Sequence, residues 1–482
     1  MHEPCASELS LKPAAALAAG VPAARLDRSA LSWALYQGCR DPYLGLINGF
    51  IFMPYFATVL VANPVQGQTL AALIGKIIGI IVAVAAPLLG GVVDRIGPRK
   101  PWLLGVTLLM APLIGALWFA APGGAGLPLS AVCIILIAVG VLIACGDVLF
   151  SSMLASAAPA EARSLASGVA LSLGNVISFI LMALMLWAFV LPGQFHASWL
   201  PTTPLLGLSP ATHEPDRIVA PLVAITFLLG AVPLFAFAKD AQRGDDGPFW
   251  RKVKEGVQGL IALVRSAREY RNVTIYILAR TASQDAGTVM LLLGGVYAAG
   301  VMQWGAMEML TYGLIGTVAG MFGGLAAGRL DNRFGPRRAL QIEIAGSLIG
   351  LLAILGTSRS QILWLWPYDP TTHAAVWHGP MFTTLPELCF LLFAFCGFIF
   401  QIAAWSSSRT LLTRLAPPSK LGSFFGLAAL AAAATGWIGP LLAGWFTDFF
   451  HSQQAGFFPV AALLVVGLMA LFFVDDRRGV AG

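Results

Sequence analysis

The chain has 482 residues, of which 58% are hydrophobic and 11% charged, with 29 Lys or Arg, 23 Asp or Glu and a net charge of +6. Because a soluble domain carries about 25% charged residues, this composition excludes a disordered chain and a soluble enzyme of this size. The six cysteines show no paired spacing, which argues against a disulfide framework or a zinc site.

Twelve long apolar stretches follow one another along the chain. A helix needs about 20 apolar residues to cross about 30 Å of hydrocarbon, and each stretch is close to that length or longer. We predict membrane-spanning helices at 31–61, 69–93, 102–121, 129–156, 164–191, 218–238, 272–300, 307–329, 339–357, 386–413, 422–446 and 456–474. The predicted fold class is an all-α membrane protein with twelve transmembrane helices.

Lys and Arg gather on one side of these spans. The termini and the connections after even-numbered spans hold 23 of the 29, whereas the other connections hold two. Cytoplasmic segments of membrane proteins are enriched in Lys and Arg. We therefore expect the tails 1–30 and 475–482 in the cytoplasm and the protein in the cytoplasmic (inner) membrane. No nucleic-acid partner and no cleaved signal peptide are expected.

The first span contains charges deep in the membrane. Arg40 and Asp41 lie about ten residues into it, and therefore about 15 Å deep at 1.5 Å per residue. Asn48 shares a helical face with Asp41, and Pro42 can break the helix locally and free backbone carbonyls. Since a charge near the bilayer centre is costly, it indicates function.

A loop sequence occurs once in each half of the chain. It is GGVVDRIGPRK at 90–100, after the second span, and GRLDNRFGPRR at 328–338, after the eighth. The widest polar connection, 239–271, lies between them, and its apolar residues recur as in an amphipathic interfacial helix. We predict two six-helix bundles, 31–238 and 272–474, joined by this linker. Half-repeats of this kind are a transporter architecture.

The seventh span, like the first, carries one Arg and one Asp inside its apolar stretch. It carries Arg280 and Asp285, with Gln284 on the face of Arg280 and Thr281 on the face of Asp285. Each half therefore places one Arg and one Asp at similar depth in its first helix.

The repeated loop resembles the signature of the major facilitator superfamily of transporters. Further segments are similar to helices 1, 10 and 11 of its vacuolar-effluxer-like, autophagy-associated branch; these are 32–36, 42–43, 50–56, 408–415, 424–427 and 439–441. The resemblance implies that the loops form a latch for the gate on their side of the membrane, with Asp147 and Arg409 as gate or loop-anchoring partners. The latch residues are Gly90, Asp94, Arg95, Gly97, Arg99, Asp331, Arg333 and Gly335.

In that superfamily the first and seventh helices line a central cavity. The resemblance thus implies that Arg40, Asp41, Arg280 and Asp285 form one polar cluster across the cavity, with Asn48 and Gln284 beside them. We expect the cluster to bind a zwitterionic or anionic substrate, and either Asp to be a proton site. The alternative is that the same charges are fixed ion pairs that only lock helices together.

The predicted function is secondary active transport of a small organic solute by alternating access. The resemblance suggests an amino acid as the solute, and the simplest energy source is a proton gradient. The alternative is a transporter-fold protein that acts as a membrane assembly or pigment-handling factor. No catalytic motif or phosphate-binding loop occurs, so we expect neither an enzyme nor a cofactor or metal. We expect a monomer in contact with membrane lipid.

Overall fold

The computed structural model describes residues 26–475 except 97, 160–161, 193–197, 199, 241–250, 252–257, 259–269, 370–371 and 417–420, and it gives the backbone alone at 86–96, 155, 164, 421–423 and 425–426. In this part of the chain, twelve helices are long and apolar enough to cross a membrane. The predicted all-α, twelve-span fold class is therefore confirmed. The predicted amphipathic helix of the linker lies outside the described residues and stays a prediction.

The first six spans form an N-terminal group of helices. In chain order its elements are α2 (Arg28–Arg40), η1 (Tyr43–Phe50), α3 (Phe52–Tyr55), η2 (Phe56–Leu60), α4 (Pro64–Ile96), α5 (Lys100–Ala116), η3 (Leu117–Phe119), η4 (Pro122–Gly124), α6 (Leu129–Ala157), α7 (Arg163–Met185), η6 (Leu186–Val190), η7 (Leu205–Gly207), η8 (Pro210–Thr212), α8 (Glu214–Arg217) and α9 (Val219–Phe237).

The last six spans form a C-terminal group. Its elements are α11 (Arg271–Met302), α12 (Ala306–Phe334), α13 (Pro336–Leu355), the strands β1 (Gln361–Ile362) and β2 (Trp366–Pro367), α14 (Leu385–Leu415), α15 (Leu421–Thr435), α16 (Ile438–Phe450), η10 (Ala455–Phe457) and α17 (Phe458–Phe472). The strands pair antiparallel, with Gln361 opposite Pro367. They form a short hairpin in the long connection between α13 and α14.

The first span is not one regular helix. After Asp41 the chain continues as the π-helix η1, the single α-turn α3 and a second π-helix, η2. Pro42 and Pro54 each lack the N–H that a continuous α-helix needs, and π-turns inside helices are frequent at functional sites. Because π geometry changes the rotation per residue, the regular face predicted for Asp41 and Asn48 does not hold along this segment.

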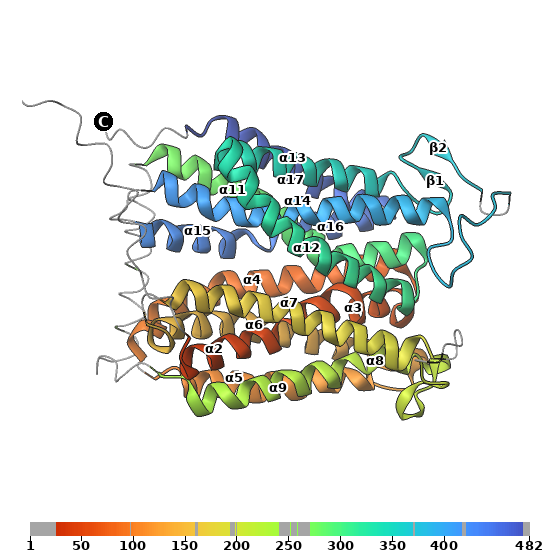
Figure 1. Cartoon of the computed structure of the whole chain (residues 1–482), viewed down its shortest axis with the longest axis horizontal. Coiled ribbons are helices and arrows are strands. Elements are labelled where there is room, and N and C mark those ends of the chain that lie inside the picture. The colour runs from red at the N-terminus through yellow and green to blue at the C-terminus, as the bar shows by residue number, and fades with distance from the viewer. Residues whose placement is uncertain are drawn as a thin grey trace, which may run out of the picture.

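The two groups lie side by side with their helices running in the same general direction (Figure 1). We call the end at which α2 begins and α17 ends the terminal face, and the end with the β1–β2 hairpin and α8 the loop face. Between the groups, α4 contacts α11, α15 and α16, while α11 contacts η1, α3 and η2. On the first span these contacts come from the part after Pro42, which runs toward the loop face.

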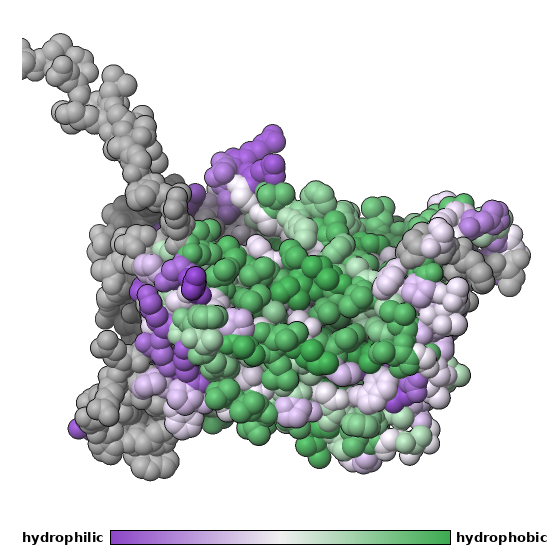
Figure 2. Space-filling model, turned by 60° about the horizontal axis from the view of Figure 1, so that its bottom comes forward, coloured by the Kyte–Doolittle hydropathy of each residue, from purple (hydrophilic) through white to green (hydrophobic). Residues whose placement is uncertain are grey.

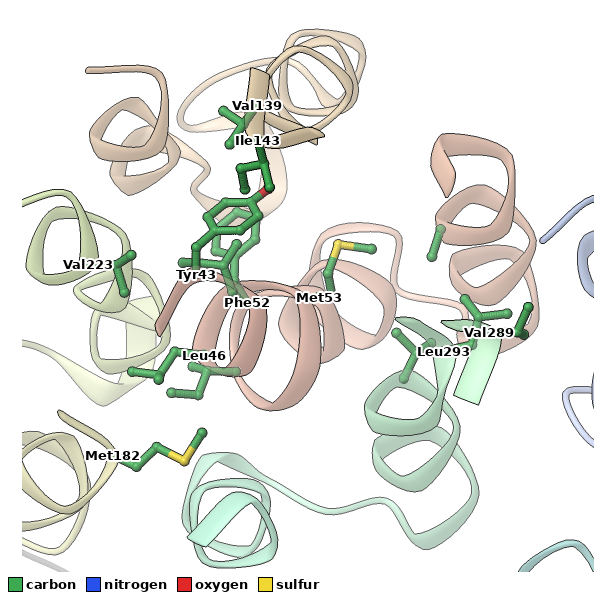
Figure 3. Packing of buried hydrophobic residues seen from close by; sticks show 14 of the residues in the cluster. Tyr43, Leu46, Phe52, Met53, Val139, Ile143, Met182, Val223, Val289 and Leu293 are labelled. Carbon is green, nitrogen blue, oxygen red and sulfur yellow. The ribbon is translucent and has the colours of Figure 1, made fainter. Parts of the chain in front are cut away.

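Apolar side chains cover the sides of the molecule. Figure 2 shows a broad hydrophobic belt between more polar ends, as a helix bundle in lipid requires. The interior is also apolar where the groups meet. In Figure 3, Tyr43 and Phe52 of the first span lie near Ile143 of α6, and Val289 and Leu293 of α11 lie on the opposite side of that span.

Candidate functional site

Three charged residues meet inside the N-terminal group. Arg40 ends α2, and its Nη2 lies 2.5 Å from an Asp147 oxygen on α6 and 3.8 Å from Asp41 Oδ1. Arg40 lies about 18 Å from the start of α2, and Asp147 about 15 Å from the end of α6, at 1.5 Å per residue. We call Arg40, Asp41 and Asp147 the N-terminal charge group. It has one cation and two carboxylates well inside the candidate membrane spans.

Neighbouring side chains hold Arg40 in place. Its guanidinium lies 5.4 Å from the centre of the Phe150 ring, which stacks on Trp33 at 4.3 Å. The Arg40 side chain is only 6% exposed, whereas that of Asp147 is 49% exposed. Asp147 is thus the more accessible partner of a buried arginine. Gly174 of α7 is required here, since a Cβ at that position would collide with the Asp41 carboxylate.

The C-terminal group contains a second pair of charges, Arg280 of α11 and Arg409 of α14. They lie close enough to repel each other electrostatically. The Nε of Arg280 is buried without a hydrogen-bond partner, and no acid forms a salt bridge with either arginine within the described part of the chain. We call these two residues the C-terminal charge group. Arg280 is about 14 Å from the start of α11, a depth similar to that of Asp147.

Asp285 lies apart from this pair. Its carboxyl interacts with Thr435 at the end of α15, and its backbone approaches Gly439 of α16. It is buried, with 5% of its surface exposed. Among the described ion pairs, none joins Arg280 or Asp285 to Arg40 or Asp41. The described ion pairs thus link charges within the N-terminal group, and the predicted polar cluster of Arg40, Asp41, Arg280 and Asp285 stays a prediction.

The structure also changes the expected partner of Arg40. Asp147, predicted as a gate or loop-anchoring residue, forms the shortest ion pair of Arg40. Sequence reasoning could not find this pair because it depends on how α2 packs against α6. Asn48 lies half-buried in η1. The roles of all these residues in transport stay predictions.

Gln284 borders a small polar void inside the C-terminal group. The void measures about 10 Å³ and is lined by Ser283, Gln284, Gln401 and Ser408, together with Ile344, Ala404, Trp405 and Leu464. This volume is about that of one water molecule, which the four polar residues could bind. A second cavity, of about 110 Å³, lies toward the loop face and is mostly apolar. Phe50, Tyr312 and Phe398 are among its walls, and Gln401 and Trp405 border both spaces.

The loop motif of the N-terminal group is only partly visible. Gly90, Asp94 and Arg95 lie where the backbone alone is described, and Gly97 lies outside the described residues. Arg99 donates from Nη1 to the Ser152 carbonyl at 3.1 Å.

Asp240, which the motif did not indicate, accepts hydrogen bonds from the backbone N–H groups of Arg99 and Lys100 at 3.0 and 2.8 Å. A carboxylate is stabilised at the start of a helix, so Asp240 fixes the start of α5.

The second copy of the motif connects α12 to α13. Gly335 stands between them with φ +81°, a conformation that glycine adopts without strain. Asp331 is buried, with one carboxylate oxygen unpartnered. Arg333 is exposed and lies over the Phe334 ring. Their predicted function as a latch stays a prediction.

Sequence reasoning missed a buried acid, Glu343 of α13. It is 0% exposed, and its Oε1 accepts a hydrogen bond of 2.9 Å from Ser407 Oγ of α14. Its Oε2 has no partner in the described structure. A signal was available, because Glu343 is an acid inside the predicted span 339–357 and intramembrane ionisable residues indicate function.

A buried polar network joins the two groups near the loop face. Gln68 of α4 donates from Nε2 to Thr447 Oγ1 of α16 at 2.9 Å and to the Gln453 carbonyl at 2.9 Å. Gln453 in turn donates to the Val296 carbonyl of α11 at 3.4 Å. We call Gln68, Thr447 and Gln453 the loop-face network. Close to it, Gly295 of α11 packs on the carbonyl of Gly49, where a Cβ would collide. These contacts hold the two groups together near the loop face.

A cavity of about 130 Å³ lies between Tyr55 of α3 and Trp304 before α12. His213 and Asp216 line it, and their Nδ1 and Oδ2 atoms are 3.0 Å apart. The hydrogen bond to Asp216 raises the pKa of His213, despite the opposing effect of partial burial.

Comparisons with known proteins agree with this architecture. A family model described as "Vacuole effluxer Atg22 like" matches residues 61–481. The chain is 23% identical over 279 residues to Autophagy-related protein 22 of Kluyveromyces lactis, covering 55% of this chain and 53% of that protein, or about half of the relative's length.

Solved structures of transporters share the fold. A D-xylose-proton symporter has a TM-score of 0.61 at 16% identity, covering 93% of this chain and 96% of that one. A peptide transporter in complex with sulfate has a TM-score of 0.60 at 14% identity, covering 94% and 96%. The fold is that of the major facilitator superfamily, and family and fold are those of a transporter and not of an enzyme.

The sequence-based placement in the cytoplasmic (inner) membrane is wrong. The matching family takes its description from an effluxer of the vacuole, and the curated relative comes from a yeast. These findings support a multi-pass membrane protein.

Proposed function

The chain belongs to the Atg22-like family of vacuole effluxers and has the transporter fold of the major facilitator superfamily, and on this premise we propose that it transports a zwitterionic solute, an amino acid, by alternating access. The two helix groups would be the bundles that move, with boundaries at 31–238 and 272–474. Transport would be driven by a proton gradient.

The observation that carries this proposal is that the N-terminal charge group has an excess of negative charge and the C-terminal charge group an excess of positive charge. The N-terminal charge group has two carboxylates for one arginine, whereas the C-terminal charge group has two arginines that no described acid pairs. An amino acid has complementary charges. Its carboxylate would accept hydrogen bonds from Arg280, since guanidinium–carboxylate contacts are among the strong ones. Its ammonium group would lie toward Asp147 and Asp41.

In alternating access, the contacts at the loop face would keep that side of the transporter closed. The loop-face network and the Gly295–Gly49 contact hold the helix groups together there, so the solute would exchange from the terminal-face side in this state. Binding sites between two repeats, near the membrane midplane, suit such rocking motions. Opening the loop face would require these hydrogen bonds to break.

A binding assay on purified protein tests the proposal. Each of the twenty amino acids would be added in a thermal-shift measurement, because a ligand that binds only the folded state raises its stability. We expect at least one to raise the melting temperature of the wild type but not of Arg280→Ala or Asp147→Asn. Arg338→Ala, at an exposed arginine of the terminal face, is the matched control and should keep the shift. A ligand shift that survives Arg280→Ala would contradict the assigned site.

The apolar cavity favours a second candidate function. Its walls of Phe50, Tyr312 and Phe398 would suit a flat apolar molecule, as a pigment-handling or membrane assembly factor would need. If such a molecule raised the melting temperature and none of the twenty amino acids did, this function would be favoured over transport of a zwitterion.

A further inference from the structure

Glu343 is the most completely buried acid of the described chain. It lies about 10 Å from the start of α13 at 1.5 Å per residue, at 0% exposure, facing α14. Ser407 donates to one carboxylate oxygen. The other oxygen has no partner, nor has the hydroxyl of Ser347 one turn further along α13, which is also 0% exposed.

No described cation offsets a charge on Glu343. From α12 the nearby ionisable group is Asp331, which is also acidic. On α13 itself, Arg337 donates to the carbonyls of Leu471 and Phe472 of α17, while Arg338 is exposed. On α14, Arg409 is exposed beside Arg280.

The remaining neighbour, α17, carries no ionisable residue between 458 and 472. Burying an ionised carboxylate without a cationic partner costs several kcal/mol, so this environment favours the neutral acid despite the hydrogen bond from Ser407.

The serine that contacts Glu343 stands beside residues that border the small void and the C-terminal charge group. Ser407, which donates to Glu343, is followed on α14 by Ser408, which lines the small polar void together with Ser283 and Gln284 of α11. The Tyr276 hydroxyl of α11 donates to the Ser408 carbonyl. A single water in the void would thus lie between α11, which carries Arg280, and Ser408, the residue that follows the serine bonded to the acid.

We propose that Glu343 is the proton-binding site that couples transport to a proton gradient. The inference rests on the proposed transport function and names the coupling ion and its site. The carboxylate takes up one proton on Oε2 when α13 and α14 separate and admit water, and the neutral acid is buried when they close. When the site next opens, the O–H bond formed at Oε2 breaks and the proton passes to water. No other bond is formed or broken.

The first test needs no substrate. Purified protein in lipid is titrated while infrared spectroscopy follows the carbonyl stretch of protonated carboxylic acids. We expect Glu343→Gln to remove a band that the wild type loses reversibly at alkaline pH. Glu308→Gln is the control, because Gln replaces Glu in the capping box at the start of α12, and it should leave the band. A titrating band that is unchanged in Glu343→Gln overturns the proposal.

Ser407→Ala keeps the test decisive if Glu343→Gln does not fold. Removing the donor that stabilises the carboxylate should move the midpoint of the titration to higher pH. An unmoved midpoint would show that the band belongs to another acid.

The second test separates coupling from a structural role. Proteoliposomes take up the amino acid that gives the largest thermal shift, with and without an imposed proton gradient. The gradient should accelerate uptake by the wild type and by Glu308→Gln, while Glu343→Gln should bind the amino acid yet show gradient-independent uptake. Acceleration that persists in Glu343→Gln overturns the inference and leaves the transport function standing. If no amino acid binds the wild type, the proposed function fails, whatever the infrared result.

Discussion

The ion pair between Arg40 and Asp147 offers a measurable test of the N-terminal charge group. Breaking a buried pair by removing one partner costs about 3–5 kcal/mol. Two features reduce this cost: Asp147 is half exposed, and Asp41 remains 3.8 Å from the guanidinium. A hydrogen bond to a charged group contributes about 1.5–3 kcal/mol. We therefore expect a coupling free energy of about 2 kcal/mol between Arg40 and Asp147.

A double-mutant cycle measures this coupling. Arg40→Gln, Asp147→Asn and the double variant are unfolded reversibly in mixed micelles, and the non-additive part of the free energy of unfolding is the coupling. The control is the exposed pair of Lys239 and Asp27, 3.4 Å apart at the terminal face. Surface pairs of this kind contribute about 0–1 kcal/mol. A coupling for Arg40 and Asp147 no larger than that of the surface pair would refute the reasoning.

Three further predictions concern the loop face. Gln68→Leu removes the central donor of the loop-face network, and it should increase hydrogen exchange in α3 and α11, read by mass spectrometry. Gly295→Ala collides with the Gly49 carbonyl and should lower uptake in proteoliposomes several-fold, because the loop face cannot close fully; normal uptake would contradict the close packing. The raised pKa of His213 reflects its contact with Asp216. This contact therefore stabilises the folded protein fully below about pH 6.5, and the stabilisation disappears as the pH rises through the raised pKa. Melting temperatures compared across this range should show the loss in the wild type but not in Asp216→Asn.

The twelve spans were predictable because an apolar stretch of about 20 residues has few structural alternatives. The structure starts the first span at Arg28 and ends the last at Phe472, within a few residues of the predicted 31 and 474. The depth of Arg40 was also predictable, since it follows from position along one helix. Its partner Asp147 was not, because the contact depends on the packing of α2 against α6. The π-helical course after Pro42 was equally hidden, since proline marks a break without fixing the geometry that follows.

Three consecutive residues of α14 explain how solute and proton could be linked. Ser407 contacts Glu343, the carbonyl of Ser408 accepts from Tyr276, and Arg409 lies beside Arg280. A movement of this turn therefore alters the acid, the void and the C-terminal charge group together.

Closer to the loop face, α13 and α14 approach so tightly that a Cβ at Gly350 would lie 3.0 Å from the Cα of Gly397. Such a contact resists separation and suits a pivot, whereas Glu343, nearer the terminal face, contacts α14 through the hydrogen bond from Ser407. In the proposed mechanism, separation of α13 and α14 at the terminal-face end would admit water to the acid and displace Arg409 in the same motion.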